Sequence, residues 1–293
     1  MQSGSRTMPG MPTSVDLELA CRSSRSRFVT VNGLALHFLK WGDPERPVLC
    51  FLHGGSAHAH WFDLVAGRFV DRFHVVSLDQ RGHGESQWAF PPAYATENFV
   101  SDLVELMDAE RWDRMTVVGH SMGGHNAMAL ASWHPDRVRA LVVVDSRPTI
   151  PPDSLEMMHQ RGRRPMRLHP SKDAATAAFR LRPRDTVADP ALLRHLGEMA
   201  VTERETGWAY RFDPEANGAR KPADAWTYVH RITAPTLLTR AELSRNLPRD
   251  QIERLRQLIP NTRVAEIAGA YHHVTLDRPR EFASVLDDFL TSL

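Results

Sequence analysis

The sequence predicts an α/β protein with a mostly parallel sheet that helices cover on both faces. Three apolar runs are too continuous for half-exposed strands, and they lie at residues 47–55, 114–121 and 138–146. They alternate with segments of helical periodicity such as NFVSDLVELMDAE. Parallel strands need crossover helices, so this alternation is typical of a doubly covered sheet. Hydrophobic residues make up 42% of the 293, which is enough to bury one large core.

The elements are expected in a regular order. Two alternating runs flank Asn32-Gly33, and both residues tolerate positive φ, so they predict a two-residue type I′ hairpin. A strand, a helix, a strand and a second helix are then predicted at PVLCFLHGG, WFDLVAGRFV, FHVVSLDQRG and NFVSDLVELMDAE. Strands at RMTVVGHS and VRALVVVDS follow, and a helix begins between them, just after Ser121.

The same rhythm returns near the C-terminus, at APTLLTR, DQIERLRQLI and TRVAEIAG. A terminal helix is predicted from apolar residues at i, i+3, i+4, i+7 and i+8, which are Phe282, Val285, Leu286, Phe289 and Leu290. We therefore assign residues 27–146 and 232–293 to one core. Residues 1–26 are rich in Ser and Arg and are expected to form a disordered tail.

Residues 147–231 interrupt the rhythm. They are rich in Pro, Arg and Met, and they hold short helical pieces such as LLRHLGEMAV but no strand-like apolar run. We interpret them as a helical cap inserted between two strands of the sheet. At the carboxyl edge of a parallel sheet, such an insertion would overhang the crevice where ligands bind.

Composition narrows the function classes. The formal net charge of +1 gives no indication of nucleic acid or of an acidic partner. Two cysteines are too few for a disulfide framework, and no apolar run reaches the length of a membrane span. We expect a cytoplasmic protein with a small-molecule partner and no nucleic-acid or membrane contact, while the oligomeric state stays open.

The most informative stretch is MTVVGHSMGGHNAMAL, because its GHSMG matches G-x-S-x-G with a strand before it and a helix after it. A strand that turns sharply into a helix strains the dihedrals of Ser121 and requires small neighbours. The turn would expose Ser121 Oγ and place the Met122 N–H where it can bind an oxyanion. The alternative is a helix-capping serine beside glycines that only permit close packing.

A serine hydroxyl needs an imidazole base near neutral pH. Of the fifteen histidines, His272 is best placed, in a loop between a strand and the terminal helix, and His273 is the alternative. His83, in DQRGHGES, is expected to make local hydrogen bonds in a turn. Three further histidines, His53, His58 and His60, lie close together in sequence. No acidic ligand motif accompanies them, so we expect them to have structural or lining roles rather than to bind a metal.

Four motifs, in order, resemble the α/β-hydrolase superfamily: HGGS, DQRGHGES, GHSMGG and HHVTLDRP. The resemblance covers the chain after the expected tail and implies an eight-stranded, mostly parallel sheet with a cap after the sixth strand. It implies Ser121 as nucleophile and His272 as general base, because the family's spacing from the histidine to the acid-x-Pro pattern selects His272 over His273. It also implies an oxyanion hole from the backbone N–H groups of Gly55 and Met122.

The triad acid departs from the family pattern. Many members carry it after the seventh strand, in a G-x-x-D pattern, where this chain has Ala241 and Ser244 instead of the glycine and the aspartate. Two carboxylates remain: Asp145 ends the sixth strand, as in some branches, and Glu242 lies in the seventh-strand loop. A carboxylate at the end of a buried strand needs a partner, and a histidine supplies one. Asp145 is preferred, with Glu242 or a missing acid as alternatives.

Serine at the elbow argues against the alkyl–enzyme chemistry of the superfamily's dehalogenases and epoxide hydrolases. We expect acyl transfer to water with a small-molecule acyl substrate and no cofactor or metal. Carboxylic esters come first, followed by thioesters, lactones, carbon–carbon bonds of diketones and perhydrolysis. A non-catalytic receptor on the same fold is the second class. Trp61 and Trp88 fit either the acyl pocket or the core, and the basic cluster RGRRPMRLHP is expected on the solvated cap surface.

Overall fold

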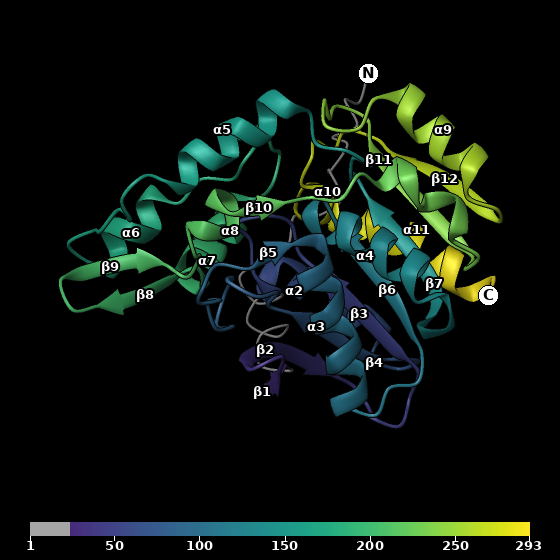
Figure 1. The fold of residues 1–293 in the computed structure, drawn as a ribbon, viewed down its shortest axis with the longest axis horizontal. Helices are drawn as coiled ribbons and strands as arrows, with labels where there is room; N and C mark the ends of the chain where they lie inside the picture. The colour runs from purple at the N-terminus through teal and green to yellow at the C-terminus, as the bar shows by residue number, and fades with distance from the viewer. Residues whose placement is uncertain (1–23) are drawn as a thin grey trace, which may run out of the picture.

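The computed structural model describes residues 24–293 (Figure 1). In spatial order, the strands of its main sheet are β1 (Arg25–Val31), β2 (Leu34–Trp41), β4 (His74–Leu78), β3 (Val48–Leu52), β6 (Met115–His120), β7 (Val138–Val144), β11 (Thr236–Ala241) and β12 (Thr262–Ile267). Neighbouring strands are parallel except in the pairs β1–β2 and β2–β4. The predicted eight-stranded, mostly parallel sheet is confirmed.

The predicted hairpin joins β1 to β2. Val31 pairs with Leu34, so the turn consists of Asn32 and Gly33, whose φ values are 50° and 75°. Positive φ at both central residues is the type I′ geometry that matches the twist of the flanking strands. Because β1 begins at Arg25, the last residues of the expected tail 1–26 belong to the sheet. The rest of that prediction, residues 1–23, lies outside the described residues.

Helices cover both faces of the sheet (Figure 1). One face is covered by α3 (Thr96–Ala109), α4 (Met122–Trp133) and α9 (Arg249–Leu258), whose apolar residues belong to one core cluster. The other face is covered by α2 (Asp63–Ala66), α10 (Val274–Asp277) and α11 (Pro279–Thr291). The predicted stripe of α11 is confirmed, because four of its five residues are buried and the fifth packs against them.

The helix predicted at WFDLVAGRFV is broken into short pieces. The chain forms η1 (Ala59–Phe62), α2 and η2 (Gly67–Phe69) instead of one continuous helix. Gly67, which has low helix propensity, stands where α2 passes into η2. Most apolar residues of the segment are nevertheless buried, so the pattern identified the core face but not the length of the helix.

The segment between β7 and β11 is an insertion with mixed structure. It contains α5 (Pro152–Gly162), α6 (Lys172–Ala178), α7 (Pro190–Met199), β8 (Val201–Arg204), β9 (Gly207–Tyr210), α8 (Glu215–Gly218), β10 (Arg220–Lys221), η4 (Ala225–Thr227) and η5 (Val229–Arg231). β8 and β9 form an antiparallel hairpin, and β10 pairs with β5 (Tyr94–Ala95) of the core. The insertion is therefore not wholly helical, and its short strands lack the apolar run that would reveal them.

The insertion packs directly on the core. Its side chains Leu181, Leu192 and Leu196 are buried in the same cluster as α11. His58, just before η1, donates from Nε2 to the carbonyl oxygen of Leu196 at 3.1 Å. Within the described chain, no helix is long and apolar enough to cross a membrane.

Replacing Leu286 by Ala is expected to lower the free energy of unfolding by about 2–5 kcal/mol, because it leaves a cavity in the core under α11. Urea denaturation of the purified chain measures this loss. The matched control is Leu168→Ala, where the same atoms are removed from a side chain that is 43% exposed. Equal losses for the two variants would contradict the described packing of α11.

Candidate active site

The elbow between β6 and α4 holds Ser121 in a strained conformation. Its φ is 51° and its ψ is −115°, which costs on the order of 1–3 kcal/mol for a residue with a side chain. Two hydrogen bonds hold this backbone in place. The Ser121 N–H donates to the Val144 carbonyl at 3.0 Å, and the Ser121 carbonyl accepts from Ser146 Oγ at 2.6 Å.

The glycines around the serine are required by space. A Cβ atom on Gly119 would lie 2.3 Å from the carbonyl oxygen of Gly123, and one on Gly123 would lie 2.2 Å from that of Leu52. On Gly124 it would lie 2.6 Å from Ser146 Cβ. Because backbone atoms cannot yield to such contacts, only glycine lets β6, α4 and β3 approach this closely.

Ser121, His272 and Asp145 form one continuous hydrogen-bonded chain. His272 lies between β12 and α10, and Asp145 directly follows β7. His272 Nδ1 lies 2.8 Å from Asp145 Oδ2, and His272 Nε2 lies 3.1 Å from Ser121 Oγ. The carboxylate can only accept, so Nδ1 carries the proton and Nε2 is left to accept from the serine hydroxyl.

The alternative residues point elsewhere. His273 donates from Nε2 to the carbonyl oxygen of Pro183 in the insertion at 3.0 Å. Glu242 is exposed, and its carboxylate accepts the Gly269 N–H at 2.7 Å. Neither side chain meets Ser121 or His272 by a hydrogen bond in the described structure. The geometry therefore agrees with the preferred assignment of His272 and Asp145.

Ser244, which stands where the family pattern has its aspartate, supports Asp145 instead. Its hydroxyl donates to Asp145 Oδ2 at 2.6 Å, while the Ala241 N–H donates to Oδ1 at 3.2 Å. Asp145 is fully buried with a φ of 44°. Burial raises the pKa of its carboxyl, and the hydrogen bond from Ser244 acts in the opposite direction by stabilising the anion. The sequence shows Ser244 at this position but does not predict its contact with Asp145, because the two residues lie 99 positions apart.

The imidazole of His272 is neutral near pH 7. Burial lowers its pKa to about 4, and the nearby Arg147 cation acts in the same direction. His120 fixes the backbone of the histidine loop, because its Nε2 donates to the His272 carbonyl at 2.8 Å. Burial also holds the pKa of His120 well below its usual range, so this donor stays uncharged.

The predicted oxyanion donors belong to two segments that adjoin the serine. Met122 is the first residue of α4, and the first N–H groups of a helix have no partner within it. Gly55 belongs to the loop after β3, and a Cβ on its neighbour Gly54 would lie 3.2 Å from Ser121 Cβ. The HGGS loop thus runs beside Ser121. The role of the two N–H groups in binding an oxyanion remains a prediction.

Buried polar contacts fasten the loops around the site. The Gln80 N–H donates to His53 Nε2 at 3.0 Å, which ties the DQRGHGES loop to the HGGS loop. Asp79, which sequence analysis did not single out, accepts from His37 Nδ1 at 2.7 Å and from the Ala59 N–H at 2.6 Å. The local hydrogen bond expected for His83 is confirmed, since its Nδ1 lies 2.8 Å from a nearby carbonyl oxygen.

The two candidate pocket tryptophans differ in environment. Trp61 is buried, and its ring lies 6.2 Å from Phe179 of the insertion and 6.3 Å from His273. Trp88 is half-buried, and the Arg204 guanidinium lies 5.0 Å from its ring centre. The arginines of the basic cluster are exposed, which confirms the expected solvated surface.

Comparisons with known proteins identify the family of this fold. Residues 47–279 match the sequence model of the alpha/beta hydrolase fold family. A 2-(acetamidomethylene)succinate hydrolase of Mesorhizobium japonicum is 26% identical over 268 residues, which are 90% of this chain and 95% of the relative. The sn-1-specific diacylglycerol lipase ABHD11 of Mus musculus is 28% identical over 277 residues, which are 92% and 89% of the two chains.

The likeness extends to three dimensions. The crystal structure of an E-2-(acetamidomethylene)succinate hydrolase matches with a TM-score of 0.82 and 25% identity, covering 92% of this chain and 99% of that chain. These relatives are hydrolases named for different substrates. Because the family model matches most of its length, and its sheet order and serine elbow are those expected of the family, this chain belongs to the α/β-hydrolase fold family.

Proposed function

We propose that this chain is a serine hydrolase that cleaves a small carboxylic ester through an acyl-enzyme on Ser121. The observation that carries the proposal is the chain of hydrogen bonds from Ser121 Oγ through His272 to Asp145, at 3.1 and 2.8 Å. A buried, neutral imidazole beside a serine hydroxyl is suited to general base catalysis. Membership in a family of hydrolases supports the same reaction class.

Acylation follows from the proton positions. His272 Nε2 accepts the hydroxyl proton as Ser121 Oγ attacks the ester carbonyl carbon. Asp145 keeps the His272 proton on Nδ1 and stabilises the imidazolium that forms. The tetrahedral oxyanion is held by the N–H groups of Met122 and Gly55. The imidazolium then gives its proton to the departing alkoxide, and an acyl-Ser121 ester remains.

Deacylation repeats these steps with water. His272 Nε2 takes a proton from a water molecule, and the resulting hydroxide attacks the acyl carbonyl. Collapse of the second tetrahedral intermediate returns the proton to Ser121 Oγ and releases the carboxylic acid. No step calls on a metal or a cofactor. The same residues serve both halves because one imidazole alternates between base and acid.

The insertion is proposed to act as a cap over the acyl group. Support comes from its contacts beside His272: the Pro183 carbonyl accepts from His273, and Phe179 packs on Trp61. The Trp61 and Phe179 rings, which lie near His273, would favour an acyl chain with apolar surface. Lactone, thioester and carbon–carbon bond hydrolysis remain alternatives, because relatives named for a succinate derivative and for diacylglycerol do not single out one bond.

Ser121→Ala and His272→Ala are expected to lower kcat for short p-nitrophenyl esters by roughly 10⁴-fold or more, because members of such a triad act as a unit. Fluorophosphonate labelling of the wild type should occur and should be lost in Ser121→Ala. The matched control is Ser284→Ala, which removes an exposed hydroxyl on α11 and should change neither readout. An unlabelled wild type would favour a non-catalytic receptor on this fold.

Two conservative variants distinguish the candidate acids. Asp145→Asn is expected to lower kcat by roughly 10⁴-fold, because the amide no longer fixes the tautomer of His272 or stabilises the imidazolium. Glu242→Gln should stay within a few-fold of the wild type, since the Glu242 carboxylate is exposed and accepts from Gly269. Steady-state kinetics with circular dichroism as a folding control measure both. Loss of activity in Glu242→Gln alone would overturn the assignment of Asp145.

The acid limb of the pH–rate profile is expected well below pH 6.5. His272 must be neutral to accept a proton, so kcat/KM is lost as the pH falls through its pKa, which burial lowers to about 4. Most of the neutral-pH value of kcat/KM should therefore persist at pH 5.5. Ester turnover measured on either side of this pH, with circular dichroism to exclude unfolding, tests the prediction. A limb centred at 6.5 or above would contradict it.

A further inference from the structure

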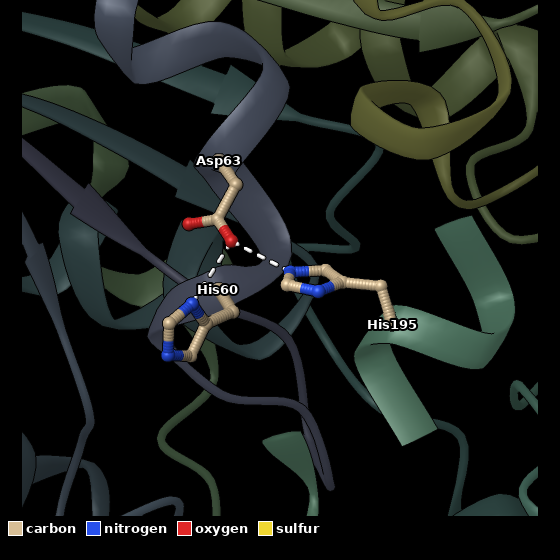
Figure 2. Close-up of side chains that lie close together, drawn as sticks. All are labelled: His60, Asp63 and His195. Carbon is tan, nitrogen blue, oxygen red and sulfur yellow. Dashed lines mark hydrogen bonds and ion pairs between the residues drawn. The ribbon is translucent and has the colours of Figure 1, made fainter. Parts of the chain in front are cut away.

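Three side chains that bind metals in other proteins meet outside the serine site. His60 comes from η1, Asp63 is the first residue of α2, and His195 comes from α7 of the insertion. Figure 2 shows both imidazoles pointing at one carboxylate. His60 Nδ1 and His195 Nε2 each lie 2.9 Å from the same atom, Asp63 Oδ2. Core and insertion thus contribute to one cluster, although His195 stands 132 positions after Asp63.

The cluster has nearly the spacing of a metal site. The three ligand atoms all lie within 4.8 Å of one another. Ligands at the bond lengths typical of tetrahedral zinc stand about 3.4 Å apart. To admit an ion, the two contacts with Asp63 would lengthen by about half an ångström, and the two histidine nitrogens, which lie within 4.8 Å of each other, would move to a similar separation. Each imidazole nitrogen that now donates to Asp63 would give up its proton to ligate the ion.

Charge and exposure favour an ion as the occupant. Asp63 is buried, and one oxygen of its carboxylate accepts hydrogen bonds from both His60 and His195. This carboxylate can supply an anionic oxygen ligand at the base of the cluster. The side chains of His60 and His195 are 21% and 13% exposed, so an ion has access from solvent.

A cavity adjoins the cluster at His60. His60 lines a cavity of about 470 Å³ together with Glu198, which lies three residues after His195 on the same helix. A three-ligand protein site leaves a coordination position for water or another group. His58 also lines this cavity, but its Nε2 already donates to the Leu196 carbonyl. The ligand set that the contacts define is thus two imidazoles and one carboxylate.

We propose that His60, Asp63 and His195 form a binding site for a divalent transition-metal ion that joins the insertion to the core. Two imidazole nitrogens and one carboxylate oxygen suit zinc, and they disfavour calcium and magnesium, which take oxygen ligands. A bound ion would fix α7 against η1. Because the unfolded chain does not hold His195 near His60 and Asp63, the ion would bind the folded state preferentially and stabilise it.

Isothermal titration calorimetry of the chelator-treated full chain with Zn²⁺ tests the proposal. Absorption spectroscopy of the same chain with Co²⁺ gives an optical readout of the site. One equivalent of each ion should bind, and Co²⁺ should give the visible absorption of a four-coordinate site. Saturating Zn²⁺ should raise Tm by about 5 °C. Absence of stoichiometric binding to the wild type would overturn the proposal.

Two variants separate metal binding from the hydrogen bonds within the cluster. His60→Asn and His195→Gln each place an amide N–H near the position of the lost ring N–H, so the contact with Asp63 can persist without an imidazole ligand. Each should weaken Zn²⁺ binding by at least about 100-fold and abolish the shift in Tm. His230→Gln, an exposed histidine on η5, is the matched control and should bind like the wild type.

If a variant fails to fold, crystallography of the wild type tests the metal site directly. In crystals of the wild type soaked in Zn²⁺, anomalous scattering at the zinc edge should show a peak between His60, Asp63 and His195. A peak only at other histidines, such as His272, would overturn the proposal. Unchanged affinity in the folded His60→Asn and His195→Gln variants would do the same. All of these readouts are independent of the proposed ester hydrolysis.

Discussion

The close approach of β6 to the first turn of α4 is the constraint on which the rest of the site depends. A methyl group at Gly119 or Gly123 would overlap backbone atoms, so only hydrogen atoms fit between the strand and the helix. That approach forces Ser121 to a φ of 51° and lifts its hydroxyl above the carboxyl ends of the strands. The strain persists because Val144 and Ser146 hold the serine backbone from the next strand.

A second constraint is that buried polar groups must be satisfied. Asp145 would be costly at the end of a buried strand without its contacts to His272, Ser244 and the Ala241 N–H. The acid can stand after β7 because β7 and β11 are neighbours, and the Asp145 N–H donates to the Thr239 carbonyl of β11 at 2.9 Å. The residues that follow β7 and β11 therefore lie close together near the His272 loop. Asp145, after β7, contacts His272, and Ser244, after β11, stands where the family pattern has its aspartate and donates to Asp145.

The insertion contacts the core near His272 because of how it packs. Leu192 and Leu196 of α7 are buried in the core cluster shared with α11, so this helix is held against the segment that follows the HGGS loop. The same contact brings His195 to Asp63 and places Phe179 on Trp61, whose ring is also next to His273. Apolar burial between the insertion and the core thus positions both the aromatic pair beside His273 and the histidine–aspartate cluster (Figure 2).

The sequence by itself determined the sheet class, the hairpin, the stripe of α11 and the elbow around Ser121, because these depend on residues close together in the chain. Tertiary structure decided which carboxylate meets His272, since Asp145 lies 127 positions away and the sequence preferred it without excluding Glu242. It also decided the short strands of the insertion and the meeting of His195 with Asp63. The pair His60 and Asp63, three residues apart, did not by itself predict a metal site, and a structural or lining role was expected for His60, because the third side chain becomes a neighbour only when the insertion packs on the core.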